Sequence, residues 1–125
     1  MKKILIIEDS ADVSSNIEYM LSKAGYSVFV ANDGADGIAQ AQENIPDLII
    51  MDIMLPDIQG GDAVNAIKKY PPCKDIPVVF LTGLMSSQEG KENIETINVD
   101  GKAYPALGKP FDFPQLLNTI KKILK

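Results

Sequence analysis

The chain has 125 residues, the size of one domain when a domain takes about 100–200 residues, and 46% of them are hydrophobic, which is enough for a core. It contains no histidine, its twelve basic residues are all lysine, and it has one cysteine. A Ser-His-Asp triad, a histidine-ligated metal, an internal disulfide and an arginine finger within the chain are therefore excluded. The net charge of −5 argues against direct nucleic-acid binding, which needs a dense basic face.

The apolar runs of the sequence are short. The longest, residues 4–7 and 48–51, fall far below the roughly 20 residues of a membrane span. The first three residues are followed by Glu8 and Asp9, which is unlike a signal peptide. We therefore expect a soluble, cytoplasmic protein without a membrane partner, made of one domain over residues 1–125.

Five apolar runs rich in β-branched residues predict strands. In chain order they are residues 4–7, 28–30, 48–51, 78–81 and 103–108. Several of these runs are continuously apolar rather than alternating, which is typical of strands buried on both faces of a sheet.

Helical spacing fills the stretches between these runs. The first helix is expected to begin after Ser10, a good N-cap, and to end at Gly25 in the C′ position. Its predicted buried face includes Met20. A second helix is expected to end before Pro46 and a third before Pro71, since proline interrupts a helix.

Two more helices are expected in the last third of the chain. Residues 86–97 have few apolar residues before Ile94 and contain Gly90, so we expect this fourth helix to dock weakly. Residues 98–102 are expected to form a loop. The last helix is expected after Pro114, with lysines near its C-terminus, where they favour the helix dipole.

Strands and helices thus alternate along the whole chain. Such alternation with short connections predicts an α/β fold, a doubly wound parallel sheet with helices on both faces and right-handed crossovers.

Polar residues follow four of the five predicted strands. Glu8 and Asp9 follow the first strand, Asp52 ends the third, Thr82 the fourth, and Lys109 comes after the fifth. Because the carboxyl ends of parallel strands meet at one edge of the sheet, where ligands bind in such folds, we expect these side chains to lie close together.

Three carboxylates at one edge would repel one another, by about 4 kcal/mol for two charges 4 Å apart at an effective dielectric constant near 20. A hard cation with oxygen ligands offsets this repulsion, and Mg²⁺ suits a site with few protein ligands. Together with Lys109 and Thr82, the cation would form a cradle for a phosphoryl group. A carboxylate in that cradle can act as the nucleophile and form an aspartyl phosphate.

Four motifs at these strand ends carry a resemblance to a known family. They are Glu8-Asp9, Asp52-Ile53-Met54-Leu55-Pro56 with Gly60 downstream, Thr82-Gly83, and Lys109-Pro110-Phe111. With these motifs in this order, the chain resembles the receiver domain of bacterial two-component response regulators, in particular the chemotaxis regulators. The resemblance covers essentially the whole length of the chain. The resemblance implies a five-stranded parallel sheet with the flavodoxin-like strand order 2-1-3-4-5.

The resemblance also implies a metal site. Asp9 would bind Mg²⁺ directly, Glu8 through a water molecule, Asp52 through its carboxylate and Met54 through its backbone carbonyl oxygen.

For the phosphoryl group, the resemblance implies that Asp52 accepts it from a phosphohistidine. Thr82 would bond a phosphoryl oxygen, and Lys109 would pair with Asp52 and then with the phosphate. Pro110 would follow a cis peptide bond that orients Lys109.

One departure from the family pattern concerns the residues that respond to phosphorylation. Receivers commonly have a tyrosine or phenylalanine three residues before the lysine, and here that position is Ala106. Tyr104 lies two residues earlier and, by strand alternation, points to the same face. The expected switch residues are therefore Thr82, Tyr104 and Ala106. The stretch between Thr82 and Lys109 is also longer than is usual in the family.

The resemblance implies partners as well. The chain would receive its phosphoryl group from a sensor histidine kinase or a histidine phosphotransfer protein, and would act on an output protein or domain. A homodimer through the face of the fourth helix, fifth strand and fifth helix is also expected. The protein would not be a conventional enzyme but would catalyse its own phosphorylation and dephosphorylation.

Two alternatives stay open at this point. A docking or dimerisation module that needs no phosphorylation is favoured by Ala106 but not by the complete acidic set. A phosphatase or phosphotransferase would need a general acid close behind the nucleophile. Two residues after Asp52 stands Met54, and Asp57 lies beyond Pro56.

Overall fold

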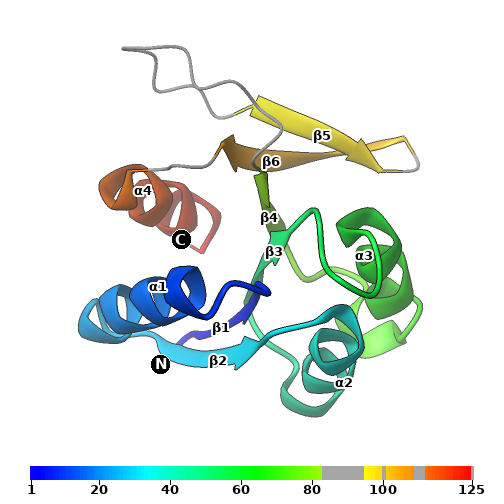
Figure 1. The fold of residues 1–125 in the computed structure, drawn as a ribbon, viewed down its shortest axis with the longest axis horizontal. Coiled ribbons are helices and arrows are strands. Elements are labelled where there is room, and N and C mark those ends of the chain that lie inside the picture. The colour runs from blue at the N-terminus through cyan, green and yellow to red at the C-terminus, as the bar shows by residue number, and fades with distance from the viewer. Residues whose placement is uncertain (83–94, 100, 109–111, 125) are drawn as a thin grey trace.

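The computed structural model describes residues 1–82, 95–99, 101–108 and 112–124. They form a six-stranded sheet in the order β2-β1-β3-β4-β6-β5, flanked by helices (Figure 1). The strands are β1 (Lys3–Ile7), β2 (Ser27–Ala31), β3 (Leu48–Asp52), β4 (Val78–Thr82), β5 (Glu95–Val99) and β6 (Lys102–Gly108). The helices are α1 (Ala11–Lys23), α2 (Gly34–Asn44), α3 (Gly60–Lys68) and α4 (Phe113–Ile123), with a 3₁₀ turn at Pro71–Cys73.

The sheet separates two hydrophobic cores. On one face α1 and α4 pack through Ile17, Leu21, Leu116 and Ile120 against alternate residues of the central strands. On the other face lie α2 and α3, and Figure 1 shows the two pairs of helices on opposite sides of the sheet. The predicted doubly wound α/β architecture is confirmed, with β6 in the place of the expected fifth strand. The expected five-stranded parallel sheet is corrected by one strand, because β5 is added at the edge and pairs antiparallel with β6. Within the described residues, no helix has the length and apolar character needed to cross a membrane.

The first helix begins and ends where its sequence predicts. The Ser10 Oγ accepts a hydrogen bond from the backbone N–H of Val13 at 3.3 Å, and Gly25 has a φ of 101° just beyond the last turn. Ile17 and Leu21 are buried, whereas Met20, expected on the buried face, is 40% exposed. The apolar stripe of α1 is thus narrower than the sequence suggests.

The expected helix over residues 86–97 is wrong for its last three residues. Residues 95–97 belong to β5, which pairs antiparallel with β6, and residues 86–94 lie outside the described part of the chain. The expected loop at 98–102 is instead the end of β5, a two-residue connection and the start of β6. Apolar and polar residues alternate in β5, and Asp-Gly is a favoured dipeptide of two-residue hairpins. Gly101 has a φ of 83°, which suits such a turn.

Candidate functional site

The carboxyl ends of β1, β3 and β4 lie at the same edge of the sheet. Ile7 pairs with Met51, so the residues that follow, Glu8 and Asp52, are level with each other. Strands β3 and β4 also pair in parallel up to this edge, which places Thr82 beside them. The strand register therefore brings together residues that are far apart in the sequence.

Three carboxylates form a cluster at this edge. Glu8, Asp9 and Asp52 each offer an oxygen atom, and these oxygens all lie within 4.8 Å of one another. Glu8 is fully buried and Asp52 is 5% exposed, while Asp9 is exposed to solvent. The cluster is therefore open on the side of Asp9 and closed on the sides of the other two.

The donor chemistry of this cluster fits Mg²⁺. All three side chains provide carboxylate oxygens, the ligand type that Mg²⁺ prefers, and an exposed side leaves room for the water molecules that this ion retains. Like charges this close cost on the order of 4 kcal/mol per pair at an effective dielectric constant near 20, and a divalent cation offsets that cost.

Backbone amides orient the two buried carboxylates. The N–H of Met54 donates to Asp52 Oδ1 and the N–H of Ser10 donates to Glu8 Oε2, each at 3.1 Å. The Asn32 side chain donates to the backbone oxygen of Glu8 at 2.9 Å, which ties the end of β1 to the end of β2. Asn32 was not expected to support the site, although its place after the second strand is the signal that could have indicated it.

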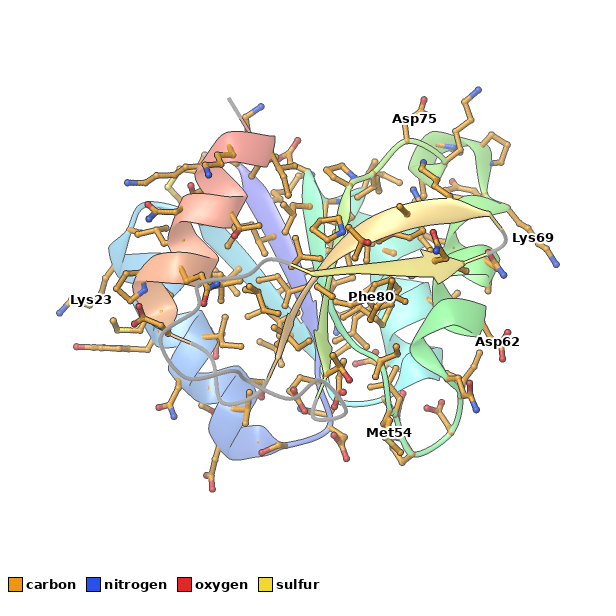
Figure 2. The ribbon with its side chains drawn as sticks, turned by 90° about the horizontal axis from the view of Figure 1, so that it is seen from above. Lys23, Met54, Asp62, Lys69, Asp75 and Phe80 are labelled. Atoms are coloured by element: carbon orange, nitrogen blue, oxygen red, sulfur yellow. The ribbon has the colours of Figure 1, made fainter. Side chains whose placement is uncertain are left out.

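The loop between β3 and α3 closes tightly over the end of β3. Met54 lies in this loop with 61% of its surface exposed, and Figure 2 shows it at the outer end of the loop. Gly60 donates to the backbone oxygen of Ile53 at 2.8 Å. A Cβ at Gly60 would lie 2.9 Å from the backbone oxygen of Asp52, so only glycine fits without a shift of the strand end.

The same loop is anchored to the N-terminus of α2. The two carboxylate oxygens of Asp57 accept hydrogen bonds from the N–H groups of Gly34 and Ala35 at 2.8 and 2.9 Å. These bonds, that of Gly34 first, hold the pKa of Asp57 below its usual value. The contact was not predicted, because its partners are 23 residues apart and no periodic pattern links them.

The expected switch residues lie along β4 and β6. Thr82 is 1% exposed and pairs with Gly108, and Ala106 pairs with Phe80. Tyr104, 6% exposed, lies two residues farther from Thr82 and contacts the Phe80 ring edge-on, with centroids 5.7 Å apart. The ammonium groups of Lys68 and Lys102 also lie over the Tyr104 ring, at 5.8 and 5.5 Å from its centroid.

Two predicted site residues, Lys109 and Pro110, lie outside the described residues, as does Phe111 of the same motif. The structure therefore brings together Glu8, Asp9, Asp52 and Thr82.

Comparison with known proteins agrees with this geometry. The family model of the response regulator receiver domain matches residues 4–121. Protein PilH of Pseudomonas aeruginosa is 35% identical over 127 aligned residues, which cover 99% of this chain and 98% of PilH. Most of the other similar curated proteins are transcriptional regulators, of which the chain spans about half the length.

Solved structures show the same similarity. The chemotaxis response regulator CheY4 of Vibrio cholerae is 32% identical and superimposes with a TM-score of 0.83 over 98% of both chains. The receiver domain of sensor histidine kinase PA1611 of Pseudomonas aeruginosa is 28% identical, with a TM-score of 0.81 over 99% of this chain and 98% of that one. That structure holds a magnesium ion in its active site cleft.

Proposed function

Because the chain belongs to the family of response regulator receiver domains, which act as phosphorylation-dependent switches in two-component systems, we propose that Asp52 is its phosphoacceptor. One observation carries this assignment. Asp52 lies at the end of β3, and its carboxylate meets those of Glu8 and Asp9 within 4.8 Å. Its Oδ1 accepts a hydrogen bond from the Met54 N–H, which fixes the orientation of the carboxylate that would attack the phosphorus atom. A phosphoryl group would pass to Asp52 as the bond to the donor nitrogen breaks.

Receiver domains of this family bind Mg²⁺ in their acidic site, and the carboxylate cluster is present in this chain. The proposed ligands are Asp9 directly, Glu8 through water, Asp52, and the backbone carbonyl of Met54. When bound, Mg²⁺ supplies positive charge that offsets the charge of the incoming phosphoryl oxygens. The amides of Met54 and Ser10 keep Asp52 and Glu8 in place for this purpose.

Thr82 and Lys109 complete the proposed phosphoryl site. The burial of Thr82 at the shared edge supports a hydroxyl contact to a phosphoryl oxygen, and its backbone is fixed by the pairing with Gly108. Lys109 follows Gly108 directly, so we assign it the ion pair with Asp52 and then with the phosphate. A cis peptide before Pro110 that orients Lys109 belongs to the same proposal.

The histidine that donates the phosphoryl group lies outside these 125 residues. Receiver domains act with histidine kinases, and this chain has no histidine of its own. We assign the donor role to a sensor histidine kinase or a histidine phosphotransfer protein in the cytoplasm. The output partner, whether a separate protein or a further domain, receives the signal after Asp52 is phosphorylated.

The contact between Phe80 and Tyr104 supports a role of Tyr104 in signal transmission through Phe80. Phe80 lies in β4 two residues before Thr82 and contacts the Tyr104 ring. Ala106, which pairs with Phe80, occupies the position where receivers usually have an aromatic residue, so no ring is present at that position. We therefore propose the route Thr82, Phe80, Tyr104 in place of the usual contact between threonine and aromatic residue. The alternative of a phosphorylation-independent docking module is not favoured, because the acidic cluster is complete.

Intact mass spectrometry after incubation with acetyl phosphate and Mg²⁺ tests the assignment of Asp52. We expect one labile phosphoryl adduct on the native protein, and none on Asp52→Asn. The matched control Asp62→Asn, an exposed acid in the first turn of α3, should gain the adduct as the native protein does. An adduct that persists in Asp52→Asn, or that forms equally without Mg²⁺, would overturn the assignment.

A further inference from the structure

The strand β5 is the outermost strand of the sheet. Among the described residues it pairs on one side only, with β6, and Figure 1 shows it at the margin of the molecule. We propose that this edge binds the same edge of a second copy of the chain, so that two sheets join into one across a two-fold axis. Such pairing requires backbone groups that point outward, a compatible register and side chains that tolerate the contact.

The pairing with β6 determines which backbone groups of β5 point outward. In an antiparallel pair, residues alternate between those bonded to the partner strand and those whose N–H and C=O point away from it. Val99 and Lys102 flank a two-residue connection, and such a pair exchanges backbone hydrogen bonds. By alternation Ile97 is also hydrogen-bonded to β6, so the backbone groups of Thr96 and Asn98 point outward. The proline opposite Thr96 agrees with this, because Pro105 has no N–H to donate.

One register between two copies uses both outward residues. If Thr96 faces Asn98 of the second copy, each of these pairs exchanges two hydrogen bonds, and the two-fold axis makes four in all. Ile97 then lies on the axis opposite its own counterpart, in the closer type of pair, with Cα atoms about 4.5 Å apart. Positions 95 and 99 of the two copies then face each other on either side of the axis.

The side chains of β5 suit this contact. Ile97 and Val99 are half-buried against the core on the α3 side, and Val99 lies beside Gly61 at the start of α3. Pairing would cover the remaining apolar surface of Ile97 on both copies. Thr96 and Asn98 are exposed on the opposite face. The strand contains neither lysine nor proline, the residues that commonly protect sheet edges from pairing.

A second copy is the occupant because the register that uses both outward residues also places Ile97 opposite its own counterpart, so that two partly exposed apolar side chains meet. The same five residues supply both sides of the pairing, as a two-fold interface demands. A strand pair of this length buries less than the roughly 1,200 Å² of stable interfaces, so the dimer should be weak and depend on concentration. The proposal does not involve Asp52 and holds for the unphosphorylated chain.

Sedimentation equilibrium of the unphosphorylated full chain, from micromolar to millimolar concentration, tests the proposal. We expect a monomer–dimer equilibrium for the native protein and for Asn98→Ala, which keeps the outward N–H. Asn98→Pro removes that N–H at a position where an edge strand accepts proline, and should shift the dissociation constant at least tenfold towards monomer. A native chain that stays monomeric at every concentration, or equal dimerisation of Asn98→Pro, would overturn the proposal.

Amide exchange of the native protein, followed by NMR, gives a readout that needs no variant. The amides of Thr96 and Asn98 should exchange more slowly as the concentration rises, whereas those of Ile97 and Val99, bonded to β6, should be protected at every concentration. Exchange of Thr96 and Asn98 that does not change with concentration would contradict edge pairing even if a dimer is observed.

Discussion

Asp57 joins the loop after β3 to the first turn of α2 through two hydrogen bonds from a single carboxylate. The N-terminus of a helix presents unbonded amides and a partial positive charge, so the ionised carboxylate is favoured there. The contact matters beyond α2, because the loop that it holds also contains Met54, whose amide orients Asp52.

The stability supplied by Asp57 should depend on pH. Its hydrogen bonds lower the pKa of the folded state below the ordinary value of 3.8, so the carboxylate stabilises the fold above that value. This stabilisation is lost as the pH falls through the lower pKa of the folded state. We expect Asp57→Asn to unfold at lower urea concentration than the native protein near neutral pH, with a difference that shrinks below about pH 4.

Asp62→Asn serves as the control for this experiment, since it removes an exposed carboxylate from the first turn of another helix, α3, and so changes the charge by the same amount. Urea unfolding of the three proteins at several pH values gives the comparison. A difference between the native protein and Asp57→Asn that stays constant down to pH values at which Asp57 of the native protein is protonated would contradict the assigned role.

Contacts between single residues can be predicted from the sequence where the order of the strands determines them, and not elsewhere. Glu8, Asp52 and Thr82 could be predicted as neighbours, because each ends a strand or directly follows one, and the carboxyl ends of parallel strands share an edge. The contact of Asp57 with Gly34 could not, because it joins a loop to a helix end without any repeating pattern. The position of a residue at the end of a strand predicts the sheet edge at which it lies. It contains no information about how a loop folds back onto a neighbouring helix.

Among the elements, the junction of β3 and α3 requires a glycine at one position, Gly60, because the backbone of β3 approaches it closely. A Cβ at Gly60 would lie 2.8 Å from the Cα of Ile53 and 2.9 Å from the oxygen of Asp52, both backbone atoms. At Gly61 the same addition would meet only the Val99 side chain, at 3.5 Å or more.

We therefore expect opposite results from the same substitution at adjacent positions. Gly60→Ala should lower the free energy of unfolding by about 2 kcal/mol or more, because backbone has to move. Gly61→Ala should be neutral or stabilise by up to about 1 kcal/mol, because alanine favours the helix. Urea unfolding measures both, and equal destabilisation by the two changes would show that general helix packing, not the close approach at Gly60, sets the requirement.

The hairpin of β5 and β6 shows why an element can be missed. The segment before Thr96 has few apolar residues and favours a helix only weakly, but in a parallel α/β chain a helix is the expected connection between strands. The alternation from Thr96 to Val99 and the Asp-Gly dipeptide before Lys102 are local signals for a hairpin, but the expected βαβ pattern outweighs them. The runs of β1, β3 and β4 are short and continuously apolar, as expected of strands buried on both faces of a parallel sheet, so their local pattern agrees with the expected topology.

For the molecule as a whole, folding concentrates negative charge in one place. The chain carries a net charge of −5, and three of its carboxylates come within 4.8 Å of one another only when β1 and β3 pair. In the unfolded chain Asp52 is far along the sequence from Glu8 and Asp9, so both the repulsion and the binding site belong to the folded state. A cation that binds this cluster must therefore shift the folding equilibrium.

Thermal unfolding with and without Mg²⁺ should report this linkage to different extents in the native protein and in Asp9→Asn. For the native chain, Mg²⁺ at a hundred times its dissociation constant should stabilise the fold by about 2.7 kcal/mol. Asp9→Asn relieves part of the repulsion, so without Mg²⁺ it should unfold at a higher temperature than the native protein, while its gain from Mg²⁺ should be much smaller. NaCl at matched ionic strength separates binding from screening, because screening acts on both proteins without a specific site. An equal Mg²⁺-induced shift in native protein and Asp9→Asn would show that the cation acts elsewhere on the acidic surface.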